Sequence, residues 1–385
     1  MTRLLHITTV AESLGFLRTQ LPAMKQRGMQ IEALCSPGPH VERMSRELDI
    51  PIHTVEMPRR ISPVQDLRAL SDLFKTIRRL NPDIVHAHTP KGGLLGTISA
   101  FTAGTPVRIY HMRGLPLETA TGWRRTLLTA TERVSTTLAT RTIAVGFALR
   151  QTALELNLCA PSRICVLAGG SGQGVDAEHR FNPQRFDADH RARSRAELGL
   201  SEDDFVVGFV GRLVVDKGIA TLTRAFEKLH QVAPNAHLVL VGPFEERDAL
   251  SPATRDALKA HPNVHLLGFQ PDTAALYPLF DLLTLPTRRE GFPNVLLEAA
   301  AMGLPVVASD IGPCQEAVAH EETGLIVPTD DDHALFAALN RYRLRPQLLA
   351  SHGEAARQRA LTRYNPSAIA DDLYELYSQL LAQRA

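Results

Sequence analysis

The chain has 385 residues, of which 44% are hydrophobic and 22% charged, so it is long enough for two folded domains and too apolar for a disordered chain. No apolar run reaches the roughly 18–20 residues that span a bilayer, and the polar residues near its start do not fit a signal peptide, so a cytoplasmic protein is expected. The net charge is +1, but the charge is unevenly distributed. Residues 1–183 are basic, with 22 Lys and Arg against 14 Asp and Glu, and residues 184–385 are acidic, with 20 Lys and Arg against 27 Asp and Glu. We expect no nucleic-acid partner.

Strand-like runs alternate with helical patterns along the whole chain. In the first half the runs are 4–9, 31–36, 83–88, 107–112, 142–147 and 164–169, and helical patterns include 16–27, 65–80 and 122–140. In the second half the runs are 205–211, 237–242, 264–269, 282–286, 306–309 and 325–328. Short apolar strands that alternate with helices are typical of βαβ units in parallel sheets. Two such series predict two α/β, Rossmann-like, doubly wound domains that face each other across a cleft.

The domain boundaries follow from composition. We predict a first domain over 1–183, a second over 184–365, and a C-terminal helix over 366–385. The polar, strandless stretch 178–196 predicts a linker. The last helix carries apolar residues on one face, which must pack against another part of the protein.

The stretch REGFPNVLLEAAAMGLPVV, residues 289–307, places two carboxylates around the start of a helix. Pro293 suits the first helical turn, and the amides of Asn294 and Val295 at the positive helix end predict an anion site. Glu290 and Glu298 lie on the order of 10 Å apart along the helix. We therefore predict that they bracket a nucleotide-sugar; the alternative is an ordinary helix with two surface glutamates.

A second motif, GRLVVDKG at residues 211–218, directly follows a predicted strand. Arg212 and Lys217 stand at the strand end and at the following helix start, where two cations could clamp a diphosphate. They would stabilise the charge of a departing nucleotide diphosphate without a metal ion. Incidental charges on an exposed connection are the alternative.

Together these motifs resemble a known family. GRLVVDKG, VGPFEE, NVHLLGF, EGFPNVLLEAAAMGLPVVASDIGPCQEAV and ETGLIVP resemble the C-terminal domain of family 4 retaining glycosyltransferases of the GT-B fold. DIVHAHTPKGGLLG, YHMRGLPLETATGWRR and GGSGQGVD resemble the branch that builds bacterial capsule, O-antigen and exopolysaccharide. The resemblance covers nearly the whole chain and is weakest at 1–80 and 178–200.

The resemblance implies metal-independent transfer, with retention, of a hexose or N-acetylhexosamine. The donor would be a nucleotide-diphosphate sugar, taken as UDP from family frequency, and the acceptor a lipid-linked glycan; no cofactor is expected. Arg212 and Lys217 would bind the diphosphate, Glu290 the sugar hydroxyls and Glu298 the ribose. Further implied donor-binding residues are Gly211, Gly268, Phe269, Gly291, Phe292, Pro293, Asn294 and Val295.

The first half departs from the family at one position. Many members carry a His-Gly pair that touches the donor sugar, whereas this chain has Arg113-Gly114, with His111 two residues earlier on the same face of the strand. Either His111 or Arg113 could fill that role. The expected acceptor-binding residues are Thr9, Glu12, Ser13, His88 and Lys91.

We predict no metal site. His86 and His88 alternate at a strand end, but a metal would need two more ligands and none is near in sequence. Core or acceptor-site histidines are the favoured interpretation. The four cysteines are scattered without a CxxC pattern and predict reduced thiols.

Basic pairs suggest a membrane partner. Trp123-Arg124-Arg125, Arg59-Arg60 and Arg78-Arg79 lie in the basic half. One hypothesis is that this face docks on the inner face of the cytoplasmic membrane to reach a lipid-linked acceptor. Solvated arginines with no partner are the alternative.

Three other functions compete with the transferase. A sugar-nucleotide 2-epimerase shares the two-domain fold, but the ordered set of Arg212, Lys217, Glu290 and Glu298 favours the transferase. A non-enzymatic sugar-binding protein would be expected to carry an export signal. A nicotinamide dehydrogenase is disfavoured because no GxGxxG follows the first strand of either half.

Overall fold

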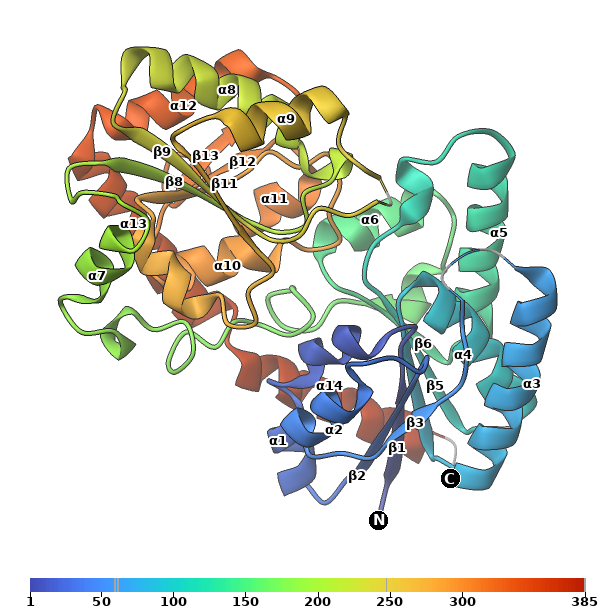
Figure 1. Cartoon of the computed structure of the whole chain (residues 1–385). Helices are drawn as coiled ribbons and strands as arrows, with labels where there is room; N and C mark the ends of the chain where they lie inside the picture. The colour runs from blue at the N-terminus through green and yellow to red at the C-terminus, as the bar shows by residue number, and fades with distance from the viewer. Residues whose placement is uncertain (59, 61, 247, 384–385) are drawn as a thin grey trace. The chain divides into compact units, whose positions relative to one another are not determined.

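The computed structural model describes residues 1–58, 60, 62–246 and 248–383. The chain forms two compact units (Figure 1). The first unit holds residues 1–174 and 366–385, and the second unit holds residues 175–365. Each unit is built on one sheet in which all strand pairs are parallel, which confirms the predicted fold class. No described helix is long and apolar enough to cross a membrane.

The first unit contains a seven-stranded sheet of order β3-β2-β1-β4-β5-β6-β7. The strands are β1 (Arg3–Ile7), β2 (Gln30–Cys35), β3 (Ile52–Thr54), β4 (Ile84–His88), β5 (Val107–Met112), β6 (Arg141–Ala144) and β7 (Ile164–Cys165). All six predicted strands are present. The sequence analysis missed β3, because its three residues are too few to show a periodic pattern.

Helices cover both faces of this sheet, as its nearly all-apolar strands require. The helical elements are η1 (Ala11–Leu17), α1 (Leu21–Gln26), α2 (Val41–Leu48), α3 (Pro63–Leu80), α4 (Pro90–Thr102), η2 (Pro116–Glu118), α5 (Gly122–Leu138), α6 (Phe147–Glu155), η3 (Pro161–Arg163) and α14 (Pro366–Ala382). Leu5 and Ile7 of β1 face the core under α3 and α4. Leu4, on the opposite face, packs in a core that includes Ile369 and Leu373 of α14. The C-terminal helix is therefore part of the first unit's core.

The second unit contains a six-stranded sheet of order β10-β9-β8-β11-β12-β13. The strands are β8 (Phe205–Val210), β9 (Ala236–Val241), β10 (Val264–Gly268), β11 (Leu282–Leu285), β12 (Val306–Ser309) and β13 (Gly324–Val327), all six as predicted. The helical elements are η4 (Pro183–Arg185), α7 (His190–Ala196), η5 (Val215–Lys217), α8 (Ile219–Val232), α9 (Pro252–Ala260), η6 (Ala274–Leu279), α10 (Asn294–Ala301), α11 (Gly312–Ala317), α12 (Asp332–Arg343) and α13 (Pro346–Arg363).

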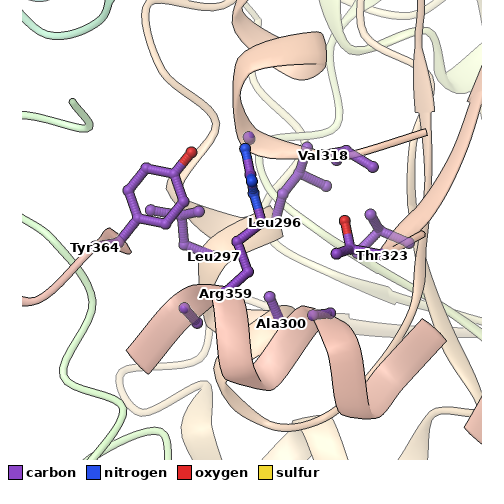
Figure 2. Close-up of a pocket in the computed structure, with 11 residues that line it drawn as sticks. Leu296, Leu297, Ala300, Val318, Thr323, Arg359 and Tyr364 are labelled. Atoms are coloured by element: carbon purple, nitrogen blue, oxygen red, sulfur yellow. The ribbon is translucent and has the colours of Figure 1, made fainter. Parts of the chain in front are cut away.

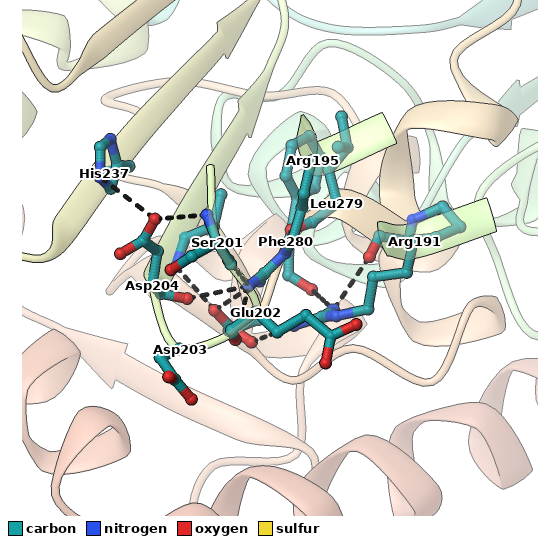
Figure 3. Close-up of polar contacts among 12 residues, drawn as sticks. Arg191, Arg195, Ser201, Glu202, Asp203, Asp204, His237, Leu279 and Phe280 are labelled. Atoms are coloured by element: carbon teal, nitrogen blue, oxygen red, sulfur yellow. Dashed lines mark hydrogen bonds and ion pairs between the residues drawn. The ribbon is translucent and has the colours of Figure 1, made fainter. Parts of the chain in front are cut away.

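The stretch 178–196, predicted as a linker, is instead a packed part of the second unit. Arg195 of α7 is fully buried and donates to the carbonyls of Leu279, Ser201, Glu202 and Asp204 at 2.9–3.2 Å (Figure 3). Its remaining terminal nitrogen pairs with Asp281 Oδ2 at 3.0 Å. A polar composition therefore hid a buried cation whose three side-chain nitrogens all have hydrogen-bond partners.

Residues 175–183 also lie in the second unit, although the sequence analysis placed them with the first domain. The Val175 amide donates to the Tyr364 carbonyl at 2.9 Å. Phe181 meets Tyr277 edge to face with ring centroids 5.9 Å apart. These contacts attach the segment to the second unit.

Candidate active site

Each sheet reverses its strand order at one point, and ligands of open α/β sheets bind beyond the carboxyl ends of the strands at such a point. In the first unit the reversal lies between β1 and β4, and in the second unit between β8 and β11. The predicted acceptor residues follow β1 and β4, and the predicted catalytic residues Arg212, Lys217 and Glu290 follow β8 and β11. The predicted site residues therefore lie where each fold would bind a ligand.

In the second unit, the loop after β11 is fastened to the turn η5 after β8. The Arg288 amide and the Thr287 hydroxyl both donate to the Asp216 carbonyl, at 2.8 and 3.0 Å. Arg289 pairs with the Asp216 carboxylate at 2.7 Å. Gly218 has φ +68, and its missing side chain lets η5 approach the loop closely. This network holds the two predicted motifs against each other.

Lys217 Nζ and Glu290 Oε1 form an ion pair, with side chains only 17% and 11% exposed. The sequence analysis assigned the two residues separate ligand groups, and the structure brings them together. Arg212 pairs instead with Glu245 at 2.8 Å and its side chain is 51% exposed. Both predicted diphosphate-binding cations are thus paired with a carboxylate.

Helix α10 begins next to Glu290. Phe292 is buried and packs against Tyr364, while Pro293 precedes the helix without a side-chain cap. The predicted anion site assumed two free amides, but the Asn294 amide donates to the Phe292 carbonyl at 3.0 Å. That half of the prediction is therefore wrong. The buried Asn294 Oδ1 has no hydrogen-bond partner within the described ranges, so this helix start retains an unsatisfied polar group.

Glu298 lies one turn into α10 and accepts a hydrogen bond from the Tyr277 hydroxyl at 2.7 Å. Burial raises the pKa of Glu298, and the Tyr277 hydrogen bond opposes that shift. Tyr277 is fully buried and was missed by the sequence analysis, because nothing in a single tyrosine of η6 signals its contact with α10. It fixes one carboxylate oxygen and so orients the other.

The remaining predicted donor-binding residues lie on loops at the same edge of this sheet. Gly211 directly follows β8 and has φ +153, and Gly268 is the last residue of β10 and has φ +63. Phe269, next to Gly268, is 63% exposed, so an aromatic face is accessible to a flat ligand. Gly291 joins Glu290 to the start of α10.

In the first unit, the ends of β1 and β4 meet through Thr9 and Thr89, whose hydroxyls lie 3.0 Å apart. Thr89 is a β-branched residue with φ +67, a strained conformation of the kind that clusters at functional sites. It was not among the predicted residues, because the strain has no local sequence signal.

The other predicted acceptor-binding residues differ in their exposure and in their ion-pair partners. Glu12 is exposed and lies 3.6 Å from His40, and Ser13 is half-buried in η1. Lys91, in the first turn of α4, pairs with Asp66 at 2.6 Å. Lys91 could bind an acceptor only by leaving that carboxylate.

The most buried polar feature of the first unit is a group of four imidazoles at the ends of β1, β4 and β5. We call His6, His86, His88 and His111 the histidine cluster; all four side chains are at most 2% exposed. Strand register places His6 beside His86 and His88 beside His111. Burial and neighbouring charge lower the pKa of each member, that of His6 to about 3. The cluster is therefore neutral at pH 7.

Arg113 adjoins the cluster. Its Nε donates to His88 Nδ1 at 3.3 Å and its guanidinium stacks 3.5 Å over the Phe16 ring. Burial lowers the pKa of Arg113 to about 9, so it remains a cation at pH 7. In the part of the chain that the structure describes, two buried atoms here have no hydrogen-bond partner: His111 Nε2 and the second terminal nitrogen of Arg113. His111 and Arg113, the two residues considered from the sequence for contact with the donor sugar, therefore lie next to the same group of imidazoles.

Among the described residues, His6, His86 and His88 are close enough together to be considered as metal ligands. Two nitrogens on a tetrahedral zinc ion would be about 3.3 Å apart, from Zn–N bonds of about 2.0 Å. His6 Nδ1 and His88 Nε2 are 2.9 Å apart, which is a direct hydrogen bond. The adjacent Arg113 cation would also repel a metal ion, so the arrangement fits hydrogen bonding better.

One further hollow in the second unit carries no site. It is lined by side chains of α10 and α13 with Tyr364, among them Leu296, Leu297 and Arg359 (Figure 2). The enclosed space is about 10 Å³, which is too small to hold a sugar and marginal for one water. It is a packing gap among α10, α11, α13, β12 and the segment that joins α11 to β13.

Comparison with known proteins identifies the family. Residues 16–170 match a model described as "Glycosyl transferase 4-like domain", and residues 204–343 match "Glycosyl transferases group 1". The capsular polysaccharide biosynthesis glycosyltransferase CapM of Staphylococcus aureus is 30% identical over 381 residues, covering 99% of this chain and 98% of CapM.

Two further relatives agree. The UDP-Gal:alpha-D-GlcNAc-diphosphoundecaprenol alpha-1,3-galactosyltransferase of Escherichia coli is 26% identical, covering 85% of this chain and 83% of that protein. The crystal structure of Anabaena Alr3699/HepE in complex with UDP-glucose superposes with a TM-score of 0.82 at 22% identity, covering 98% and 100% of the two chains. The chain is a group 1 glycosyltransferase of the capsule and polysaccharide biosynthesis family, and its two units are the two Rossmann-like domains of the GT-B fold.

Proposed function

We propose that this glycosyltransferase moves a hexose or N-acetylhexosamine from a UDP-sugar to a lipid-linked glycan, with retention and without a metal ion. The observation that carries the proposal is the Lys217–Glu290 ion pair at the β8/β11 switch point. The Escherichia coli relative, which is named for a UDP-Gal donor and a diphosphoundecaprenol acceptor, and the Anabaena complex with UDP-glucose support the choice of substrates.

The ion pair suggests how the donor is bound. A diphosphate carries more negative charge than one carboxylate, so it would displace Glu290 from Lys217 and Glu245 from Arg212. Glu290 would then be free to accept hydrogen bonds from the sugar hydroxyls. Glu298, with one oxygen fixed by Tyr277, would hold the ribose with the other.

In the transfer step, the bond between the anomeric carbon and the diphosphate oxygen breaks, and its electron pair leaves with UDP. Lys217 and Arg212 stabilise that charge. The acceptor oxygen attacks the same face of the sugar, and its proton passes to the leaving phosphate. These two cations supply the charge stabilisation that a metal ion supplies in other transferases, which is the basis for proposing metal independence.

A donor screen tests this function. The protein is incubated with UDP-, GDP-, ADP- and dTDP-sugars, and free nucleotide diphosphate is measured by mass spectrometry. We expect one UDP-sugar to be cleaved slowly by the wild type and not by Glu290→Gln. Glu321→Gln, which removes an exposed ion pair with Arg341 in the same unit, is the matched control and should stay active. Epimerisation of the donor, or cleavage that survives Glu290→Gln, would refute the proposal.

Retention, metal independence and the acceptor are tested on the active donor. NMR of the first sugar released should show the anomer of the donor, and excess EDTA should leave the rate unchanged. Undecaprenyl diphosphate-linked glycans should accept the sugar, whereas water-soluble sugar phosphates should not. Release of the opposite anomer would contradict retention, and loss of activity in EDTA would contradict metal independence.

We also propose that the first unit docks on an anionic membrane surface. Trp123 at the start of α5 is 74% exposed and is followed by the exposed Arg124 and Arg125. The outer side of α3 adds the exposed apolar residues Val64 and Leu67 and several arginines. Aromatic and basic residues together suit the interface of an anionic bilayer, where each cation contributes about 1 kcal/mol. Arg59, named above with the basic pairs, lies outside the described residues.

Vesicle flotation tests the docking. We expect the protein to float with vesicles rich in anionic lipid and not with neutral ones. Trp123→Ala should reduce binding several-fold, whereas Val232→Ala, at a 54% exposed apolar residue of the second unit, should not. Equal flotation of both variants would refute the assignment of this face.

A further inference from the structure

Hydrogen bonds connect the C-terminal helix to His111 through a second histidine. The Tyr377 hydroxyl of α14 lies 2.5 Å from His86 Nδ1. His86 Nε2 lies 3.2 Å from His111 Nδ1. The last atom of this series, His111 Nε2, is buried and has no hydrogen-bond partner among the described residues. The chain of contacts therefore runs from a buried phenol to a free imidazole nitrogen.

The neighbouring pair shows that tautomers in this cluster can be assigned from the contacts. A guanidinium only donates, so His88 Nδ1, which receives Arg113 Nε, must be unprotonated. Neutral His88 then carries its proton on Nε2 and donates to His6 Nδ1 at 2.9 Å. One donor-only residue thus fixes the protons of two imidazoles in turn.

Tyr377 acts in the same way on the other pair. An imidazole nitrogen is a more basic acceptor than a phenol oxygen, so the stronger hydrogen bond has Tyr377 donating to His86 Nδ1. His86 must then carry its proton on Nε2 and donate to His111 Nδ1. His111 in turn carries its proton on Nε2. The reverse arrangement would leave the Tyr377 hydroxyl proton without an acceptor among the contacts of the described residues.

We propose that Tyr377 and His86 are positioning residues that hold His111 as a neutral hydrogen-bond donor at Nε2, directed at an oxygen of the sugar substrate. This inference rests on the proposed function, because it assigns the substrate oxygen as the missing partner of that atom. His111 is then neither a general base nor a metal ligand. Arg113, whose own free nitrogen is buried nearby, is a second donor in the same site.

The backbone beside His111 supports a ligand at this position. A Cβ added to Gly172 would lie 2.9 Å from His111 Nε2, so any side chain there would fill the space that a partner atom needs. Gly172 has φ +68, and its carbonyl is held by the Gln20 side chain at 2.7 Å. The loop is therefore fixed so that backbone, and no side chain of residue 172, faces the buried Nε2 atom of His111.

The test is nitrogen NMR of ¹⁵N-histidine-labelled protein without substrate, with His111 assigned by difference from a His111→Gln variant. We expect the wild type to show a protonated Nε2 and an unprotonated Nδ1 at His111. In Tyr377→Phe the bias is removed, so the two tautomers should become about equally populated. With the active donor, kcat should then fall about twofold while the affinity for UDP alone stays unchanged.

The matched control is Tyr342→Phe in the second unit. It removes a buried Tyr–His hydrogen bond of 2.8 Å, to His352, and should alter neither the His111 spectrum nor kcat. A wild-type His111 protonated on Nδ1, or a Tyr377→Phe spectrum identical to wild type, would overturn the inference. Should Tyr377→Phe not fold, the wild-type spectrum alone decides. The spectra need no substrate, so a correct tautomer with no turnover of any donor sugar would refute the proposed function and leave the hydrogen-bond assignment intact.

Discussion

Gly218→Ala should separate the two motifs of the donor site. Gly218 has φ +68, and a Cβ there would lie 1.8 Å from the carbonyl oxygen of Pro286. Real Cβ atoms do not approach closer than 3.0 Å, so η5 and the loop after β11 must move apart by more than 1 Å. The left-handed backbone costs an alanine about 1 kcal/mol, and the overlap adds about 1–3 kcal/mol. We expect a total destabilisation of the second unit of about 2–4 kcal/mol.

Gly199→Ala is the control for this substitution. Gly199 has φ +71 in the same unit, and nothing lies within 4 Å of its added Cβ. It should cost about 1 kcal/mol, from the backbone alone. Thermal unfolding compares the stabilities, and calorimetric titration with UDP should show at least tenfold weaker binding for Gly218→Ala only, because Lys217 moves away from the loop. Equal stability and equal UDP affinity of the two variants would refute the reasoning.

Three further predictions concern buried groups. Arg195→Met should lower the free energy of unfolding of the second unit by about 3 kcal/mol, because four carbonyls and one side of Asp281 lose their donor. Arg193→Met on the same helix breaks only an exposed pair and should change the stability little, so equal thermal shifts of the two variants would contradict this. The histidine cluster stays neutral in the folded first unit, so unfolding takes up protons below pH 6.5. Stability is complete above that pH and should fall, as the pH drops from 6.5 towards 5, by about 1.4 kcal/mol per pH unit for each histidine, measured as loss of amide-exchange protection in β4 and β5. Burial raises the pKa of Cys35 to about 11, so this thiol should resist iodoacetamide at pH 8 until the protein unfolds.

Local patterns predicted much of this fold. The twelve predicted strands are all present, because each is a short apolar run between turn residues. The missed β3 shows the limit: three residues give no period, and the strand exists because β2 offers it a partner. The linker prediction shows another limit, since composition cannot reveal that Arg195 donates both to carbonyls of the loop that follows its helix and to Leu279 and Asp281, more than 80 residues away.

The site was less predictable than the fold. The positions of Glu290 and Lys217 follow from their motifs, but their pairing does not, because it depends on how two loops meet at a sheet edge although the paired residues are 73 positions apart in the sequence. The same holds for Tyr277 and Glu298. The histidine cluster can be recognised only from the register of three strands. The residues around His6 in the sequence therefore gave no sign that it belongs to the cluster.

The pairing of Lys217 with Glu290 has a consequence for binding that the separate motifs do not imply. The diphosphate of UDP must compete with Glu290 for Lys217, so the carboxylate should oppose the binding of UDP alone while it favours the sugar of the complete donor. An ion pair with little exposure is worth about 1 kcal/mol, which corresponds to about fivefold in affinity. Glu290→Gln should therefore bind UDP about fivefold more tightly than the wild type and yet fail to turn over the UDP-sugar. Lys217→Met should weaken both. Calorimetric titration separates the cases: if Glu290→Gln and Lys217→Met weaken UDP binding equally, the two residues act only as a structural pair, and neither binds the donor as proposed.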